Sequence, residues 1–277
     1  MNPKFLLDTR HIDPKKSLGQ NFLHDPNALE KIVETAGVRP TDYVLEIGPG
    51  TGALTVYLAQ SAARVIAIEI DQRLIPILED QVRDFGNVQI IHADILETHI
   101  PSLIGVQEYV VVGNLPYYIT SAILRHLLEV PHKPRRLVVT IQQEVADRLV
   151  APPGDMSLLA ISVLFYGQPR IVTRLPPAAF WPRPEVASAV VQIDVYPQPR
   201  VEVPDETTFF KVVRAGFGQK RKQLKNSMGA GLGLSHPQAA SLLEASGVDP
   251  MRRAETLTLE EWAAVTRTVV AASPEQF

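Results

Sequence analysis

Four consecutive residues, Asn114-Leu115-Pro116-Tyr117, combine groups that can bind and activate an amine. They follow an apolar run over residues 109–112 that predicts a buried strand. The side-chain amide of Asn114 and the carbonyl groups of Leu115 or Pro116 can accept the two hydrogens of an exocyclic amine such as adenine N6. The ring of Tyr117 offers a stacking face. The structural alternative is an ordinary proline-containing loop between a strand and a helix.

A glycine-rich segment, Glu46-Ile47-Gly48-Pro49-Gly50-Thr51-Gly52, lies between a predicted strand and a predicted helix. Gly48 and Gly50 let the backbone turn tightly and approach a ligand closely. Glu69 ends the second strand about 20 residues later, the spacing of an acid that binds ribose hydroxyls. The Gly-x-Gly-x-Gly spacing disfavours a dinucleotide oxidoreductase, whose third glycine falls later, and it resembles the S-adenosylmethionine loop of class I methyltransferases.

Two further residues are candidates for contacts with bases. Asp94 follows the third predicted strand, where a carboxylate can accept a hydrogen bond from the adenine amino group of the cofactor. Phe180 lies in a proline-rich loop and, together with Tyr117, could sandwich a flipped-out base. The structural alternatives are a turn cap for Asp94 and a core position for Phe180.

The elements that must position these residues alternate between strand and helix. Strands are predicted at 43–47, 64–69, 88–92, 109–113, 137–142, 171–175 and 189–195. Such alternation predicts an α/β fold with a doubly wound parallel sheet, and the last two strands predict an antiparallel edge. From residue 197 onward only helical periodicity is found. We therefore expect a cofactor-binding domain over residues 1–196 and a small all-α domain over residues 197–277.

Composition narrows the range of functions. The chain has 277 residues, 45% of them hydrophobic, and no cysteine, which excludes disulfides, thiolate metal sites and a cysteine nucleophile. No apolar run reaches the ~18 residues of a membrane span. Asp8 interrupts the short apolar N-terminal stretch, so no signal peptide is expected. The histidines lack metal-ligand spacing. These features predict a cytoplasmic protein that needs no metal and no membrane.

A cluster of positive charges is the candidate contact for nucleic acid. Lys220, Arg221, Lys222 and Lys225 occupy a stretch without an acidic residue, although the net charge of the chain is −3. A solvated helix face is the structural alternative. The contrast between this dense cluster and the acidic balance of the chain favours contacts with RNA phosphates.

Several motifs together resemble one family along nearly the whole chain, the bacterial ribosomal RNA small-subunit adenine dimethyltransferases associated with kasugamycin sensitivity. The matching segments are residues 16–23 (KSLGQNFL), 46–52 (EIGPGTG), 114–121 (NLPYYITS), 142–146 (QQEVA), 180–184 (FWPRP) and 217–222 (FGQKRK). The resemblance implies the class I methyltransferase fold and S-adenosylmethionine as the cofactor.

The resemblance also implies roles for particular residues. The residues that it assigns to the cofactor are Asn21, Leu23, Gly48, Glu69, Asp94 and Asn114. It places the target adenine between Tyr117 and Phe180. The implied substrate is a pair of adjacent adenosines in the 3′-terminal hairpin of 16S rRNA, dimethylated at N6 by a monomeric enzyme on a small-subunit assembly intermediate.

Two other functions share these features. The large-subunit rRNA methyltransferases that confer macrolide resistance have a similar loop and turn, but Leu115 followed by Tyr117 and Tyr118 favours the small-subunit enzyme. A binding module that has lost catalysis is the non-enzymatic alternative. Retention of the glycine loop, Glu69, Asp94 and Asn114 argues for an active enzyme.

Overall fold

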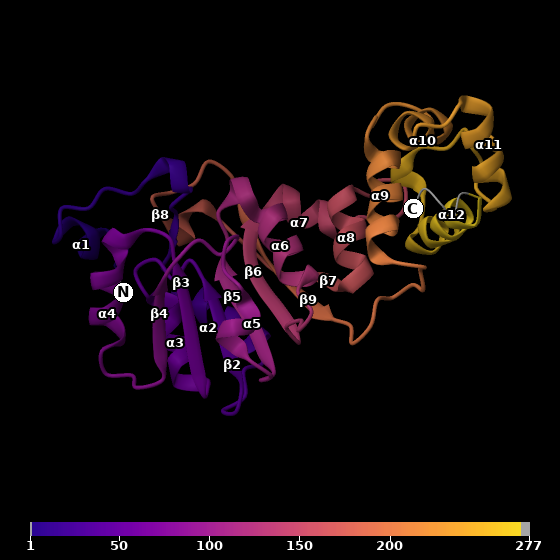
Figure 1. Ribbon diagram of the computed structural model, residues 1–277. Coiled ribbons are helices and arrows are strands. Elements are labelled where there is room, and N and C mark those ends of the chain that lie inside the picture. The colour runs from indigo at the N-terminus through magenta and orange to yellow at the C-terminus, as the bar shows by residue number, and fades with distance from the viewer. Residues whose placement is uncertain (1, 273–277) are drawn as a thin grey trace. The chain divides into compact units, whose positions relative to one another are not determined.

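The computed structural model describes residues 2–272, and the chain divides into two compact units (Figure 1). One unit comprises residues 1–146 and 168–195, and the other comprises residues 147–167 and 196–277. Residues 147–167, which the sequence places in the first domain, group with the second unit because the aromatic side chains of this segment pack there. Phe165 stacks on Phe209 with ring centroids 4.6 Å apart. Residues 1 and 273–277 of the expected domains lie outside the described residues.

A seven-stranded sheet forms the centre of the first unit, in the order β4-β3-β2-β5-β6-β9-β7. The strands are β2 (Tyr43–Ile47), β3 (Arg64–Glu69), β4 (Val88–His92), β5 (Tyr109–Asn114), β6 (Arg136–Gln142), β7 (Gly167–Leu175) and β9 (Ser188–Val195). Strands β2 to β6 pair in parallel, and β9 pairs antiparallel with β6. Strand β7 lies beyond β9 and forms the edge of the sheet. The antiparallel strand β9 is therefore the second strand from this edge.

The strand order reverses between β2 and β5. From β2 the chain proceeds outward to β3 and β4 and then returns to pair β5 on the other side of β2. In open α/β sheets ligands bind outside the carboxyl ends of the strands at such a switch point. The glycine-rich segment follows β2, and Asn114 ends β5, so both lie where the topology favours a ligand site.

Burial of the strands on both faces explains why their sequences are almost continuously apolar. Leu45, Ile66, Val111 and Val138 are buried, and helices cover the sheet. On one face, α2 and α3 pack against the even-numbered valines of β2, β5 and β6. The helices of this unit are α1 (Pro3–Asp8), α2 (Pro26–Ala36), α3 (Ala53–Ser61), α4 (Ile75–Val82), α5 (Ile100–Ile104), α6 (Thr120–Glu129) and, up to residue 146, α7 (Gln143–Leu149).

The N-terminal segment is more ordered than its polar sequence suggests. Strand β1 (Phe22–Leu23) pairs antiparallel with β8 (Phe180–Trp181). Phe180 follows Leu23 by 157 residues in the chain. Leu7 of α1 is buried against Phe22 and the apolar side chains of the β3–α4 connection. The indigo segment in Figure 1 therefore follows the carboxyl ends of the strands.

The second unit is helical. Its helices after residue 196 are α9 (Glu206–Phe217), α10 (Leu224–Leu232), α11 (His236–Ala245) and α12 (Leu259–Ala272), and α8 (Leu158–Tyr166) packs with α9 and α12. Trp262, Phe209 and Leu243 form part of its buried core. Among the described residues of the chain, no helix combines the length and apolar character needed to cross a lipid bilayer.

Candidate active site

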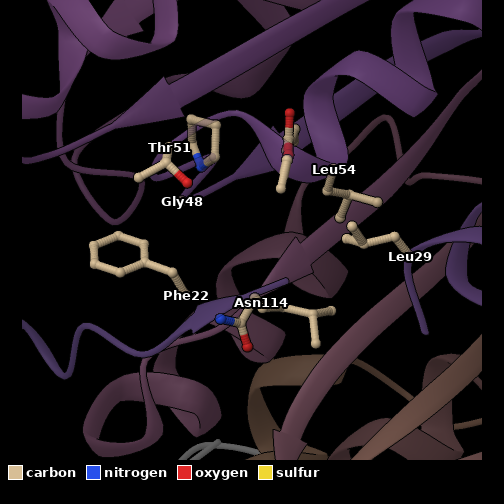
Figure 2. A pocket seen from close by; sticks show the side chains of 10 residues that line it. Phe22, Leu29, Gly48, Thr51, Leu54 and Asn114 are labelled. Carbon is tan, nitrogen blue, oxygen red and sulfur yellow. The ribbon is translucent and has the colours of Figure 1, made fainter. Parts of the chain in front are cut away.

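Two small cavities lie at the carboxyl ends of β2 and β5, on either side of Gly48 and Asn114. The larger is lined by Leu18, Gly19, Gln20, Asn21, Phe22, Gly48, Gly50, Glu69, Ile70, Leu74, Asn114 and Pro116. The smaller is lined by Phe22, Leu23, Leu29, Glu46, Gly48, Pro49, Thr51, Ala53, Leu54 and Asn114. Figure 2 shows Phe22 on one side of the smaller cavity and Leu29 and Leu54 on the other. Seven predicted site residues thus meet here, Asn21, Leu23, Gly48, Gly50, Glu69, Asn114 and Pro116.

The glycine loop between β2 and α3 makes the close approach that the sequence predicts. Gly48 and Gly50 adopt φ angles of +64° and +58°, which side chains disfavour. A Cβ on Gly50 would lie only 2.8 Å from the Phe22 ring. At Gly48 and Gly50, backbone rather than side chain therefore faces the cavities.

Glu69 is buried, with 4% of its surface exposed, and it anchors the glycine loop. Its Oε2 accepts a hydrogen bond from Gly50 N–H at 3.0 Å, and its Oε1 accepts one from Asp71 N–H at 2.8 Å. Burial raises the pKa of Glu69, while the backbone N–H groups of Asp71, Gly50 and Ile70 oppose the shift. A carboxylate has about four acceptor positions, so Glu69 can still accept a ligand hydroxyl.

The amide of Asn114 is held in one orientation. Its Nδ2 donates to the carbonyl oxygen of Asn21 at 2.7 Å. Because a carbonyl oxygen can only accept, the amide nitrogen must face it, and Oδ1 is left to accept from another donor. In Figure 2 the nitrogen points towards the side on which Phe22 lies. Asn114, the last residue of β5, thus offers one acceptor oxygen in a fixed orientation.

The backbone carbonyls after Asn114 are not equivalent. Pro116 O accepts from Ile119 N–H at 3.3 Å and from the Thr120 hydroxyl at 3.0 Å, which uses both of its lone pairs. Leu115 N–H donates to Thr140 O at 3.0 Å, whereas Leu115 O forms no hydrogen bond with the part of the chain that the structure describes. Leu115 therefore offers the carbonyl that can receive a second amine hydrogen.

The two predicted base-stacking residues differ in accessibility. Tyr117 is half-buried, and its hydroxyl lies 2.7 Å from Ser188 Oγ at the start of β9, which fixes the ring from its far end. Phe180 has only 3% of its surface exposed and packs in the core with Leu23 and Ala179. Neither ring lines the two cavities.

Asp94 also lies outside the lining of the two cavities. Its Oδ1 accepts from Leu96 N–H at 2.8 Å, so it caps the turn that follows β4. This is the structural role that such a residue commonly has at a strand end. Its half-buried carboxylate keeps a second oxygen for a ligand.

Glu46 is a cavity residue to which the sequence analysis assigned no role. Its Oε2 is fully buried and has no hydrogen-bond partner among the described residues, and it lines the smaller cavity. Burial raises the pKa of Glu46 to about 8, and the negative charge of nearby Glu69 adds to the shift. An acidic residue inside an otherwise apolar strand was the signal in the sequence.

The raised pKa of Glu46 predicts that the ligand-free protein becomes less stable as pH rises. Between about pH 4.5 and 8 the folded state keeps a proton that the unfolded state has lost, so the free energy of unfolding should fall by up to about 1.4 kcal/mol per pH unit. The neutral variant Glu46→Gln should flatten this slope. Chemical denaturation at several pH values measures both, and equal slopes would contradict the assignment.

The predicted RNA-contacting residues belong to the second unit. Lys220, Arg221 and Lys222 are exposed in the turn between α9 and α10, and Lys225 is half-buried in the first turn of α10. This turn is formed because α9 ends at Phe217 and the chain reverses before Leu224, which is buried. Within residues 2–272 no group of three or more acidic or histidine side chains is arranged to hold a metal ion.

Comparison with known sequences relates the chain to rRNA-modifying enzymes. The profile of the ribosomal RNA adenine dimethylase family matches residues 12–268. Ribosomal RNA small subunit methyltransferase A of Dehalococcoides mccartyi (strain CBDB1) is 48% identical over 261 residues, which cover 94% of this chain and 89% of that protein. The protein of the same name from Alkaliphilus metalliredigens is 44% identical over 263 residues, 92% of each chain.

Solved structures share the fold over both units. The 23S rRNA methyltransferase ErmE has a TM-score of 0.70 and 28% identity, with 90% of this chain and 99% of that chain covered. A dimethyladenosine transferase from Plasmodium falciparum has a TM-score of 0.77 at 23% identity, covering 92% and 98%. The expected methyltransferase fold, with its doubly wound sheet and antiparallel strand, is confirmed.

Proposed function

Because this chain belongs to the ribosomal RNA adenine dimethylase family, we propose that it transfers methyl groups from S-adenosylmethionine to N6 of two adjacent adenosines in the 3′-terminal hairpin of 16S rRNA. One observation carries the proposal most directly. Asn114 presents an oriented amide oxygen at the carboxyl end of β5, beside a cavity that also contains the glycine loop and Glu69.

The donor set of the larger cavity fits this cofactor. Gly48 and Gly50 bring bare backbone to the ligand, and Glu69 keeps acceptor capacity for a ribose hydroxyl. Asn21 and Leu23 border the same region, and Asp94 offers an acceptor for the adenine amine. Glu46 adds a carboxylate with a buried oxygen that has no hydrogen-bond partner among the described residues. A positive charge in the smaller cavity would stabilise the ionised form of this carboxylate. When bound, S-adenosylmethionine supplies a methyl group on a positively charged sulfur.

On the acceptor side, the residues of the β5 turn position the amine. The N6 lone pair of adenine is delocalised into the ring, so the amine is a weak nucleophile. Asn114 Oδ1 and Leu115 O would each accept one N6 hydrogen, which holds the nitrogen pyramidal and directs its lone pair. The amine gains a positive charge as the nitrogen–methyl bond forms and the methyl–sulfur bond breaks, which would leave the sulfur neutral. The amine then loses this charge by releasing one N6 proton to water. Fixed acceptors stabilise that developing charge without rearranging.

Tyr117 and Phe180 complete the proposed site for the target base. Burial raises the pKa of the Tyr117 hydroxyl, so this group stays protonated and keeps its contact with Ser188. The Tyr117 ring is the accessible stacking face. Because Phe180 is buried, the base can lie between both rings only after Phe180 becomes accessible. Four methyl transfers per ribosome require a pocket that also accepts N6-methyladenosine.

The exposed residues Lys220, Arg221 and Lys222, with Lys225, supply the proposed contacts with rRNA phosphates. They belong to the second unit, whereas the residues that line both cavities belong to the first. The proposal therefore assigns chemistry to one unit and part of the RNA binding to the other.

Glu69→Ala should weaken binding of S-adenosylmethionine by roughly 1–3 kcal/mol, because buried ligand hydroxyls and the Gly50 amide would lose their acceptor. Isothermal titration calorimetry on the folded variant measures the change. Glu69→Gln, which keeps one acceptor oxygen, should fall between the alanine variant and the original protein. Unchanged affinity in the alanine variant would remove Glu69 from the cofactor site.

Transfer of labelled methyl groups to small ribosomal subunits that lack these modifications tests the function directly. We expect labelled N6,N6-dimethyladenosine in the small-subunit rRNA and none in large subunits treated in parallel. Label in large-subunit rRNA would instead support the activity named for ErmE. RNA binding without any turnover would support a binding module.

A further inference from the structure

The segment of residues 13–23, here called the strap, forms one side of the larger cavity. Leu18, Gly19, Gln20, Asn21 and Phe22 line this cavity from the side opposite the glycine loop and Glu69. The two cavities measure only about 30 and 70 Å³. Ligand sites of cofactor size occupy roughly 300–1,000 Å³. A cofactor is larger than either cavity, so it must extend beyond them or displace the strap that borders the larger one.

Asp71 is the residue on which the contacts of the strap converge. Its Oδ2 accepts from Gln20 Nε2 at 2.9 Å, and its Oδ1 lies 3.4 Å from Lys15 Nζ. Arg73 binds both carboxylate oxygens and also donates to Asp13 O at 3.2 Å. Gln20 in turn accepts from Lys15 N–H at 2.7 Å. Asp71 itself has 2% of its surface exposed, so its charge depends on these partners.

The same carboxylate is linked to both halves of the proposed chemistry. Asp71 N–H donates to Glu69 Oε1, which connects it to the cofactor side. Next to Gln20, the carbonyl of Asn21 receives the Asn114 amide at 2.7 Å, which connects it to the acceptor side. The position of the Asn21 carbonyl follows from the path of the strap. Gln20 fixes this path before Asn21 through Asp71, and Phe22 fixes it after Asn21 by pairing with Trp181.

We propose that Asp71 is a positioning residue that fastens the strap across the cofactor cavity and thereby fixes the Asn21 carbonyl that orients Asn114. The catalytic part of this inference rests on the methyltransferase function proposed above. Hydrogen bonds from the Arg73 guanidinium, the main cause, and from the Gln20 amide lower the pKa of Asp71 far below its usual range. Asp71 therefore stays ionised at neutral pH and can hold these partners there.

Trypsin reports on the strap without any need for methyl transfer, since Lys15 and Lys16 are exposed cleavage sites within it. Asp71→Asn keeps the size of the side chain but removes its charge. We expect cleavage after these lysines to accelerate on the order of tenfold, the effect of losing one hydrogen bond to a charged group. Affinity for S-adenosylhomocysteine should fall by a similar factor, and the single-turnover rate at saturating cofactor should also fall. Unchanged cleavage and affinity would overturn the proposal.

Asp80→Asn is the matched control. Asp80 pairs with Arg10, which precedes the strap, and both side chains of this pair are exposed. It should leave cleavage at Lys15 and Lys16, cofactor affinity and turnover unchanged. If Asp80→Asn has the same effects as Asp71→Asn, the result reflects general loosening of the N-terminus and contradicts a specific role for Asp71.

A reciprocal exchange supplies a second test that is independent of the stability of Asp71→Asn. Gln20→Glu places two carboxylates against each other and should also free the strap. The double variant Gln20→Glu/Asp71→Asn restores an amide–carboxylate pair and its single charge, so it should recover protection from trypsin and cofactor affinity relative to both single variants. Absence of recovery would overturn the pairing.

The readouts separate this inference from the proposed function. A freed strap with an unchanged single-turnover rate would overturn the link from Asp71 to Asn114. If the original protein transfers no methyl group to small subunits, the proposed function fails, but the trypsin and ligand-binding results still decide whether Asp71 fastens the strap.

Discussion

Replacing Asn114 by alanine is expected to slow methyl transfer by about a hundredfold or more while rRNA affinity stays nearly unchanged. Loss of one preorganised contact to the transition state costs on the order of 3 kcal/mol. The structure makes this contact specific, because the Asn21 carbonyl holds the amide nitrogen and so directs Oδ1. Single-turnover kinetics at saturating cofactor and RNA measure the effect on the chemical step.

Asn87→Ala is a suitable control for the Asn114 variant. The amide nitrogen of Asn87 also donates to backbone carbonyls, those of Ala59 and Ala62. Asn87 directly precedes β4, so it lies at the amino ends of the parallel strands, whereas Asn114 lies at their carboxyl ends. Its loss should lower the melting temperature without changing the turnover of the folded protein. A near-normal rate for Asn114→Ala, with the control also normal, would contradict the proposed role of Asn114.

Neutralising Lys220, Arg221 and Lys222 together is expected to weaken rRNA binding and to reduce its dependence on salt. Each phosphate contact that is lost should lower the slope of log affinity against log salt by roughly 0.7 to 0.9. Cofactor affinity should not change, because the cavity residues belong to the other unit. Titrations of rRNA at several salt concentrations provide the slope.

A variant that neutralises Arg200, Arg253 and Arg267 removes the same number of charges elsewhere in the helical unit. These three arginines contact Glu260, Glu255 and the Glu202 carbonyl, so their charges are already engaged. We expect the salt slope of this control to stay close to that of the original protein. Equal slopes for all three proteins, combined with a lower melting temperature for the cluster variant, would assign the cluster a structural role.

Local patterns predicted the parts of the fold that depend on neighbouring residues. The strand over 43–47 and the strand over 64–69 agree with β2 and β3 because burial on both faces requires an unbroken apolar run. Glu69 and Asn114 could be located because parallel strands end at the same edge. Helix α10 is difficult to delimit from sequence because its glycines weaken helical propensity. Gly231 is nevertheless required there, since a Cβ would lie 2.5 Å from Ala215 of α9.

Contacts between distant residues could not be predicted in the same way. Phe22 pairs with Trp181, and Gln20 contacts Asp71, although nothing near either residue in the sequence indicates its partner. The same reason applies to Tyr117 and Ser188. Burial is likewise a property of the whole fold, so the raised pKa of Glu46 and the core position of Phe180 became visible only in three dimensions.

The division of site residues between the two units has a consequence for inhibitor design. The cavities are bounded by glycine backbone, the buried carboxylates Glu46 and Glu69, and apolar side chains. A glycine loop followed by an acidic residue is common to many nucleotide-binding enzymes. A compound that mimics the cofactor would therefore discriminate poorly between such enzymes. The strap and the exposed cations between α9 and α10 include segments 16–23 and 217–222, through which the chain resembles one family, so compounds that engage them have the better prospect of selectivity for that family.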